Sequence, residues 1–216
     1  MRWTCLLTTS TMKIEKIEKS KHKRERVLVF LEGGDLLRIT DAELLRFGLF
    51  AGMDLSDALV EQLRRAAAYS ETKIRAAHMA SSRMMSKREL CRRLEQKGAA
   101  SDDAAQIADQ MEALGAVDDE AYAGVIVRHY GGMGYGAMRV RQELQRRGVP
   151  KELWDAALLQ LPDAQDAIEQ FIHSKCKGTP PDRARLKKLS DALLRRGFSW
   201  SDIRPVLNRL GENIEE

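Results

Sequence analysis

The feature that most constrains the fold is a helix ending that occurs three times at nearly constant spacing. Three glycines, 50 and 49 residues apart, each follow a basic residue and stand four residues after a leucine. The endings are Leu94 to Gly98, Leu144 to Gly148 and Leu193 to Gly197. A glycine just past a helix can adopt the left-handed conformation that closes the last turn, and basic residues there suit the negative end of the helix dipole. The sequence therefore predicts tandem helical units.

Signals for further helices surround these endings. Ser101 to Asp103 gives a capped, acidic helix start, and Pro150 suits a first helical position. Ser86 to Glu89 and Ser199 to Asp202 resemble capping boxes. Helical spacing selects the expected core residues, which are Ile107, Met111 and Leu114, then Leu153, Trp154, Ala157 and Leu158, then Ile203, Val206 and Leu207. Each unit is expected to contain about three short helices that become stable only when stacked.

The region before the repeats predicts strands. Two apolar runs, Arg26 to Leu31 and Leu36 to Ile39, flank a Gly-Gly turn and indicate a β-hairpin. We expect Asp41 to cap a following helix, and another helix to run from Ser56 to about Ser81. Lys13 to Arg26 is dense in charge and is expected to be solvated.

The fold class that follows is mainly α, with tandem three-helix repeats in an elongated curved array and a small N-terminal β-hairpin plus helix region. We expect Met1 to Thr11 to be a disordered extension from an upstream start, with Met12 the usual start. The predicted domains are a disordered basic tail at 1–22, the hairpin and helix region at 23–72, and repeats at 73–122, 123–163 and 164–216.

Composition restricts the function classes. The 216 residues are 44% hydrophobic and 31% charged, which is typical of a globular protein, and the net charge of +4 permits acidic partners without requiring them. Three cysteines far apart argue against a disulfide scaffold and favour the cytoplasm. No apolar run approaches the roughly 20 residues that span a membrane.

No motif predicts a reaction, a metal or a cofactor. Gly131 to Gly136 lacks the lysine of a phosphate-binding loop and follows a helix, so it is interpreted as a linker. Asp118 to Glu120 are adjacent, share no helix face, and are expected to cap a helix. His173 and Cys176 could share a face but would form only half of a metal site.

The basic residues are the candidate binding residues. They are Arg92, Arg93 and Lys97 in the first unit, Arg139, Arg141, Arg146 and Arg147 in the second, and Arg185, Lys188, Arg195 and Arg196 in the third. One interpretation is that they only solvate outer faces and cap helices. The other is a basic strip, repeated once per unit, that meets phosphates or an acidic protein groove.

Four segments of the repeats have a specific pattern. They are Arg-x-x-Ser-x-x-Glu-Leu-x-x-x-Leu-x-x-Lys-Gly from Arg83, the junction from Gly115 to Ala123, the segment from Gly134 to Val149, and the ending from Leu193 to Phe198. Together these segments resemble the RecX family of bacterial regulators of the RecA recombinase. The resemblance covers about Ala76 to Leu210. The Gly-Gly hairpin and following helix also resemble the extra N-terminal region of longer members.

The resemblance implies a non-enzymatic protein that binds in the groove of RecA filaments on single-stranded DNA. It also implies limits on strand exchange, ATP turnover and co-protease activity, with direct DNA binding in some members; we expect a monomer. Met79-Ala80, Met85 and Met133 depart from the family pattern, which puts packing or anion contacts there in doubt. Two alternatives stay open: a stand-alone nucleic-acid binder and a helical scaffold for another partner.

Overall fold

The computed structural model describes residues 11–21, 26–176 and 181–212 of the chain. The predicted extension at 1–10 lies outside the described residues. The chain divides into two units, Met1–Met79 with Leu94–Ile107 and Ala80–Arg93 with Ala108–Glu216. Each unit is described by itself below.

The first unit contains a four-stranded antiparallel sheet in the order β3-β2-β1-β4. The strands are β1 (Thr11–Lys19), β2 (Val27–Leu31), β3 (Leu36–Ile39) and β4 (Asp54–Ser56). β2 and β3 form the predicted hairpin, and Gly33 and Gly34 both have positive φ in its turn. The hairpin was therefore correctly predicted, but it is half of a larger sheet.

Strand β1 occupies a segment that was predicted to be a solvated tail, so that prediction is wrong for Thr11–Lys19. Its register against β2 shifts at a β-bulge between Ile14 and Lys16. The bulge breaks the alternation of inward and outward side chains, which is the signal that identifies a strand in a sequence. Lys16 and Glu18 form an ion pair at 2.6 Å, so the dense charge belongs to the exposed side of the strand.

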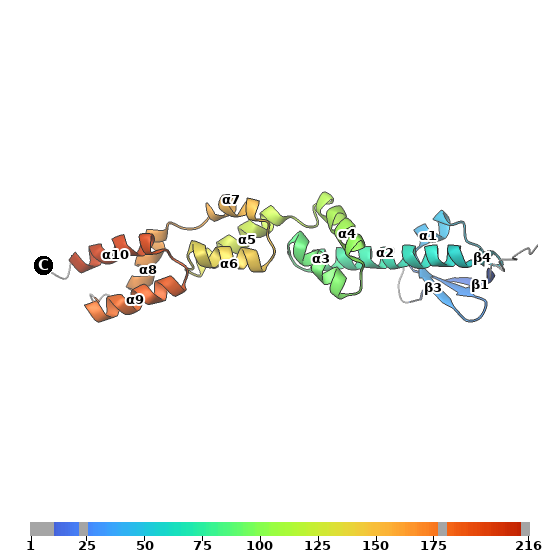
Figure 1. Ribbon diagram of the computed structural model, residues 1–216, viewed down its shortest axis with the longest axis horizontal. Helices are drawn as coiled ribbons and strands as arrows, with labels where there is room; N and C mark the ends of the chain where they lie inside the picture. The colour runs from blue at the N-terminus through green and yellow to red at the C-terminus, as the bar shows by residue number, and fades with distance from the viewer. Residues whose placement is uncertain (1–10, 22–25, 177–180, 213–216) are drawn as a thin grey trace, which may run out of the picture. The chain divides into compact units, whose positions relative to one another are not determined.

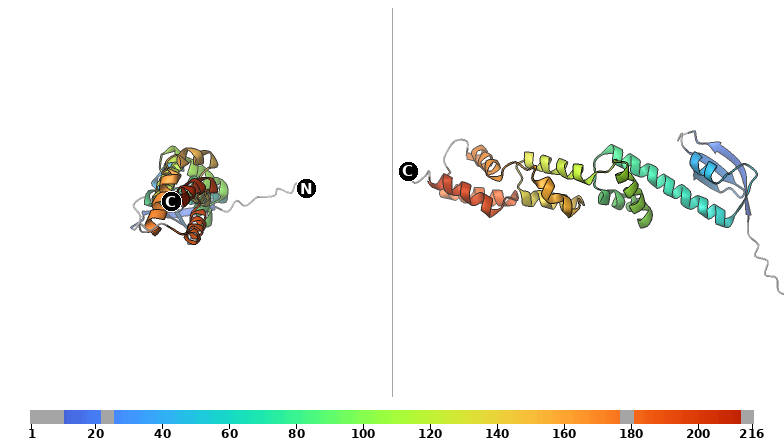
Figure 2. Two further views of the ribbon diagram at one scale, coloured as in Figure 1. Left: turned by 90° about the vertical axis from the view of Figure 1, so that its left-hand side faces the viewer. Right: turned by 90° about the horizontal axis from the view of Figure 1, so that it is seen from above.

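Helix α1 (Asp41–Arg46) and most of helix α2 (Asp57–Ser82) also belong to this unit, and Figures 1 and 2 show α1 and the start of α2 beside the sheet. Val29 and Leu31 of the sheet share one core cluster with Leu63 of α2, and Leu44 of α1 packs against that cluster. Thr40, rather than Asp41, caps α1 through a complete capping box with Glu43.

The remaining described chain is helical. Its elements are α3 (Lys87–Gln96), α4 (Ser101–Ala113), α5 (Asp119–Gly132), α6 (Ala137–Arg146), η1 (Lys151–Leu153), α7 (Trp154–Leu158), α8 (Ala164–Cys176), α9 (Arg183–Arg195) and α10 (Trp200–Glu212). In Figure 1 the helices α5, α6 and α7 form one group and α8, α9 and α10 form another. The fold is thus mainly α, with helical repeats after an N-terminal antiparallel sheet.

The three glycine endings have the predicted conformation. Gly98, Gly148 and Gly197 have φ angles of 92°, 73° and 86°. Val140 and Leu144 of α6 lie in one core cluster, while Leu193 of α9 lies in another. The predicted core is wrong at one position, because Leu114 follows the end of α4 and is 73% exposed.

Candidate functional site

The helix groups α5–α7 and α8–α10 correspond to the second and third predicted repeats. The contact between them, called the 2–3 joint, consists of Gly136, Met138, Arg196 and Gly197. The Gly136 amide donates to the Arg196 carbonyl at 2.9 Å, and the Met138 amide donates to the Gly197 carbonyl at 3.0 Å. A Cβ at Gly197 would lie 2.3 Å from the Arg139 nitrogen, so only glycine fits there. The start of α6 is thereby joined to the end of α9 through main-chain atoms.

Arg196 reinforces the 2–3 joint with its side chain. Its Nη1 donates to the Met133 and Gly134 carbonyls at 3.0 and 3.1 Å. The guanidinium also lies over the Phe171 ring at 4.8 Å and over the Tyr135 ring at 5.3 Å. Such cation–π contacts favour a fixed position. Arg196 was predicted to bind a partner, and the structure places it against the chain itself.

An equivalent joint, called the 1–2 joint, connects the start of α3 to the end of α6. Ser86 Oγ donates to the Arg147 carbonyl at 2.5 Å, as the Gly136 amide does to the carbonyl of Arg196. The Lys87 amide donates to Asp119 Oδ1 at 2.8 Å. Arg147 Nη1 donates to the Tyr122 hydroxyl at 2.8 Å. The 1–2 joint therefore consists of Ser86, Lys87, Asp119, Tyr122, Arg147 and Gly148. Its contacts use side chains, whereas the hydrogen bonds between Gly136, Met138, Arg196 and Gly197 at the 2–3 joint are between main-chain atoms.

Lys87 and Asp119 are the charged groups of the 1–2 joint. Lys87 Nζ pairs with Asp109 at 2.6 Å and with Glu112 at 2.7 Å. The hydrogen bond to Asp109, followed by that to Glu112, raises the pKa of Lys87 well above its ordinary value. Burial raises the pKa of Asp119, although the hydrogen bond from the Lys87 amide opposes this. Asp119 was predicted only to cap a helix, but it links two repeats.

Asp119→Asn is expected to leave the 1–2 joint intact, because the amide oxygen can still accept from Lys87. Asp119→Ala removes the acceptor and should cost about 2 kcal/mol of unfolding free energy. Since the folded pKa is raised, ionisation of Asp119 lowers stability as pH rises from the ordinary value of 3.8 through the folded value. Urea unfolding against pH measures both effects, and equal losses for the two variants would contradict this role.

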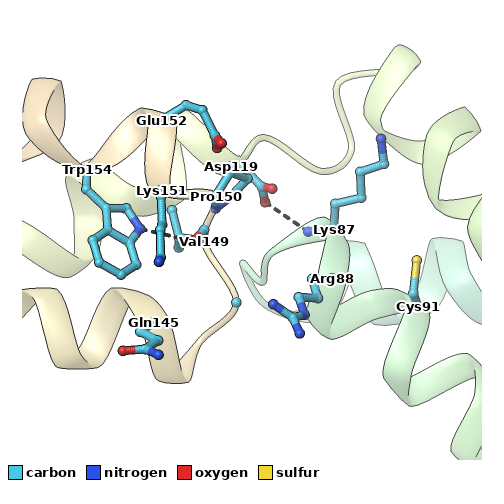
Figure 3. Close-up of a pocket in the computed structure, with 11 residues that line it drawn as sticks. Lys87, Arg88, Cys91, Asp119, Gln145, Val149, Pro150, Lys151, Glu152 and Trp154 are labelled. Carbon is cyan, nitrogen blue, oxygen red and sulfur yellow. Dashed lines mark hydrogen bonds between the residues drawn. The ribbon is translucent and has the colours of Figure 1, made fainter.

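A pocket of about 580 Å³ opens beside the 1–2 joint. Figure 3 shows Trp154, Lys151 and Gln145 on one side, with Arg88 and Cys91 on the α3 side. Trp154 Nε1 donates to the Val149 carbonyl at 3.0 Å, which fixes the indole. No group of three or more His, Cys, Asp and Glu residues that could hold a metal occurs in the described ranges.

The predicted basic residues gather most densely around Glu143 of α6. Its carboxylate is 5% exposed and faces Arg139 at 3.4 Å, Arg146 at 2.6 Å and Arg147 at 3.8 Å. Burial acts to raise the pKa of Glu143, but the hydrogen bond and charge of Arg146 outweigh it, so the pKa is lowered. Three guanidiniums against one carboxylate leave two positive charges in excess. We call Arg139, Arg146, Arg147 and Glu143 the α6 arginine cluster.

The other predicted binding residues are distributed over separate helices. Arg93 pairs with Glu89 at 2.8 Å and Arg141 pairs with Asp155 at 3.2 Å. Arg185 Nη2 donates to the Lys175 carbonyl at 2.6 Å. Among the predicted binding residues, Arg92, Lys97, Lys188 and Arg195 are exposed and form no ion pair in the described part of the chain. The structure thus brings the α6 residues together and assigns Arg147 and Arg196 to the joints.

Sequence reasoning missed the residues that form the joints. Ser86 was recognised only as a helix cap, although its hydroxyl both accepts from the Glu89 amide and donates to Arg147. Ser86 and Arg147 are 61 residues apart, and Gly136 and Arg196 are 60 residues apart. These similar separations can be counted in the sequence, but no local motif indicates that the residues are in contact.

None of the described helices combines the length and the apolar character that crossing a membrane requires.

Comparisons with known proteins agree with this architecture. The family models for the second and third three-helix domains of RecX match residues 118–158 and 163–207. The regulatory protein RecX of Geobacillus kaustophilus is 32% identical over 212 residues, which cover 94% of this chain and 79% of the relative. That of Streptococcus equi subsp. zooepidemicus is 28% identical over 203 residues, covering 92% and 77%.

Solved structures show the same fold. A crystal structure of regulatory protein RecX aligns with a TM-score of 0.71 at 22% identity, covering 91% of this chain and 99% of that one. A RecX structure from Lactobacillus salivarius aligns with a TM-score of 0.57 at 19% identity, covering 67% and 97%. With repeats joined as described and a relative 32% identical over 94% of this chain, the chain belongs to the RecX family of regulatory proteins.

Proposed function

We propose that the protein is a non-enzymatic regulator that binds RecA recombinase filaments on single-stranded DNA. In this proposal it acts in the cytoplasm as a monomer and modulates, mostly by inhibition, strand exchange, ATPase and co-protease activity in DNA repair and the SOS response. The observation that carries the proposal is the pair of equivalent joints, which connect the start of the basic helix α3 to the end of α6 and the start of α6 to the end of α9. A polymer of identical subunits is the natural partner of such a surface.

Repetition explains how modest contacts suffice. Once one helix group is bound, the next is held near its own site, so the contacts add through effective concentration. A protein bound more tightly to one filament state than to another shifts the population toward that state. ATP turnover then slows without any chemistry by the regulator. This mechanism needs no catalytic residue in the chain.

The contacts we assign to the filament are the basic residues that the joints do not use. They are Arg92, Arg93, Lys97, Arg139, Arg141, Arg146, Arg185, Lys188 and Arg195. Arg139 and Arg146 of the α6 arginine cluster form the centre of this surface, because the charge excess of the cluster is not neutralised within the protein. Phosphate or carboxylate groups would neutralise it.

Replacing Arg139 and Arg146 together with alanine is expected to weaken filament binding about tenfold, as loss of two charge-assisted contacts of modest strength would. Both guanidiniums are substantially exposed, but the buried Glu143 carboxylate would keep only Arg147 as a partner, so thermal unfolding of the variant is measured beside binding. Arg64→Ala in the first unit, where Arg64 pairs with Asp35, is the matched control. Co-sedimentation with filaments measures the effect, and equal binding by both variants would remove the α6 arginine cluster from the interface.

The direct test of the proposal is RecA ATPase activity on single-stranded DNA with substoichiometric protein added. Inhibition together with co-sedimentation is the expected result. The purified protein without RecA should hydrolyse no nucleotide. Absence of both inhibition and co-sedimentation would reject the proposal.

A stand-alone nucleic-acid binder is the second candidate, and the exposed cations without ion pairs favour it. That function predicts binding to single strands without RecA, with a steep loss in salt of about −0.7 per neutralised phosphate in a double-logarithmic plot. Filament binding instead depends on RecA being present. Titration of labelled DNA at several salt concentrations, with and without RecA, separates the two.

A further inference from the structure

Leu114 and Leu159 occupy the same place in two successive repeats. Each stands four residues before an aspartate that begins the next helix group, Asp118 or Asp163. Asp118 Oδ1 accepts from the Ala121 amide at 2.8 Å, and Asp163 Oδ1 accepts from the Gln165 amide at 2.8 Å. The two leucines therefore lie at equivalent turns, where the last helix of one group ends and the first helix of the next is capped.

Both leucines are almost fully exposed, with 73% of Leu114 and 86% of Leu159 accessible. The core positions of these helix ends are taken by other residues, since Met111 and Ala157 are 3% and 5% exposed. A single exposed leucine on a protein surface is ordinary and needs no explanation. Two at equivalent positions, with the sequence otherwise different around them, indicate a contact that is made once per repeat.

The charges around the leucines select the partner. Exposed carboxylates without an ion pair in the described part of the chain follow both leucines in the sequence: Asp118 and Glu120 after Leu114, and Asp163 and Asp166 after Leu159. Two further acidic residues close in sequence, Glu112 and Asp155, are paired with Lys87 and Arg141. A nucleic acid would be repelled by these turns, because its phosphates have the same sign of charge. A protein surface with an apolar pocket bordered by lysine or arginine would be attracted.

We propose that Leu114 and Leu159 are apolar anchors that insert into equivalent, basic-rimmed pockets on successive identical protein subunits. This inference rests on the proposed function, since the filament supplies such subunits at regular intervals. It adds a second, chemically different surface to the α6 arginine cluster. The leucine turns bind protein, whereas the basic helices meet phosphates or carboxylates.

The experiment compares Leu114→Ser, Leu159→Ser and the double variant with the parent protein. Affinity is measured for preassembled RecA filaments and, separately, for single-stranded DNA. Each single variant should lose about tenfold in filament affinity and the double about a hundredfold, while DNA affinity stays unchanged. Leu45→Ser is the matched control, because Leu45 is 80% exposed but lies in the first unit. Thermal unfolding should be the same for all variants.

The outcomes distinguish this inference from the proposed function. If the parent protein binds filaments and the double variant binds equally well, the anchors are wrong and the proposed function stands. Equal losses in filament and DNA affinity would also overturn the anchors. If the parent protein does not bind filaments at all, the proposed function fails and the inference fails with it.

Discussion

Gly197→Ala is expected to destabilise the protein by about 4 kcal/mol, near the upper end of single-substitution effects. The added Cβ would lie 2.3 Å from the Arg139 nitrogen and 2.9 Å from its Cα, both main-chain atoms that cannot move independently. The positive φ of 86° adds strain of about 1–2 kcal/mol. The chain can relieve the clash with Arg139 and the backbone strain only by opening the 2–3 joint.

Gly98→Ala is the matched control for this substitution. Gly98 has a similar φ of 92°, but nothing lies within 4 Å of the position of an added Cβ. Its cost should be limited to the backbone strain of about 1–2 kcal/mol. Urea unfolding measures both variants, and limited proteolysis should find Gly197→Ala cleaved faster near the 2–3 joint. Equal losses would show that close packing at the joint contributes nothing.

Glu143→Ala has the second large expected effect, a loss of about 2–3 kcal/mol. The carboxylate is buried and satisfies Arg146 through two hydrogen bonds of 2.6 and 2.9 Å. Its removal leaves the three guanidiniums of the α6 arginine cluster facing one another. Because those guanidiniums are partly exposed, water screens part of their repulsion, and the loss stays below that of a fully buried pair.

The lowered pKa of Glu143 determines how its contribution to stability changes with pH. The folded pKa of Glu143 is lowered, so the stability it contributes is present above its ordinary value of 4.5 and is lost as pH falls through the folded value. Glu143→Gln should therefore be less stable than the parent at pH 7, and the difference should shrink in acid. A pH-independent difference in the urea midpoint would contradict the electrostatic explanation.

Local sequence signals were sufficient for much of the fold. A leucine, a basic residue and a glycine at fixed offsets report a helix end because the physics of that end involves only neighbouring residues. The hairpin was found for the same reason, since Gly33 and Gly34 provide the turn between two apolar runs. Strand β1 was missed because a bulge interrupts its alternation and because its charged side chains, such as Lys16 and Glu18, resemble those of a solvated segment.

The candidate site was less predictable, because helical periodicity shows which residues share a face but not what covers that face. Arg147 and Arg196 have the same sequence context as the exposed basic residues, yet both hold joints. Leu114 fits the apolar period of α4 but falls past its last turn. Ser86 and Arg147 are brought together only by the packing of whole repeats.

The most direct test of the central claim is a reconstruction of a RecA filament on single-stranded DNA with this protein bound. We predict that α6 and α9 contact successive subunits in equivalent ways, with Leu114 and Leu159 seated in protein pockets. Protein bound to DNA alone, or held by only one helix group at a single subunit, would contradict the account.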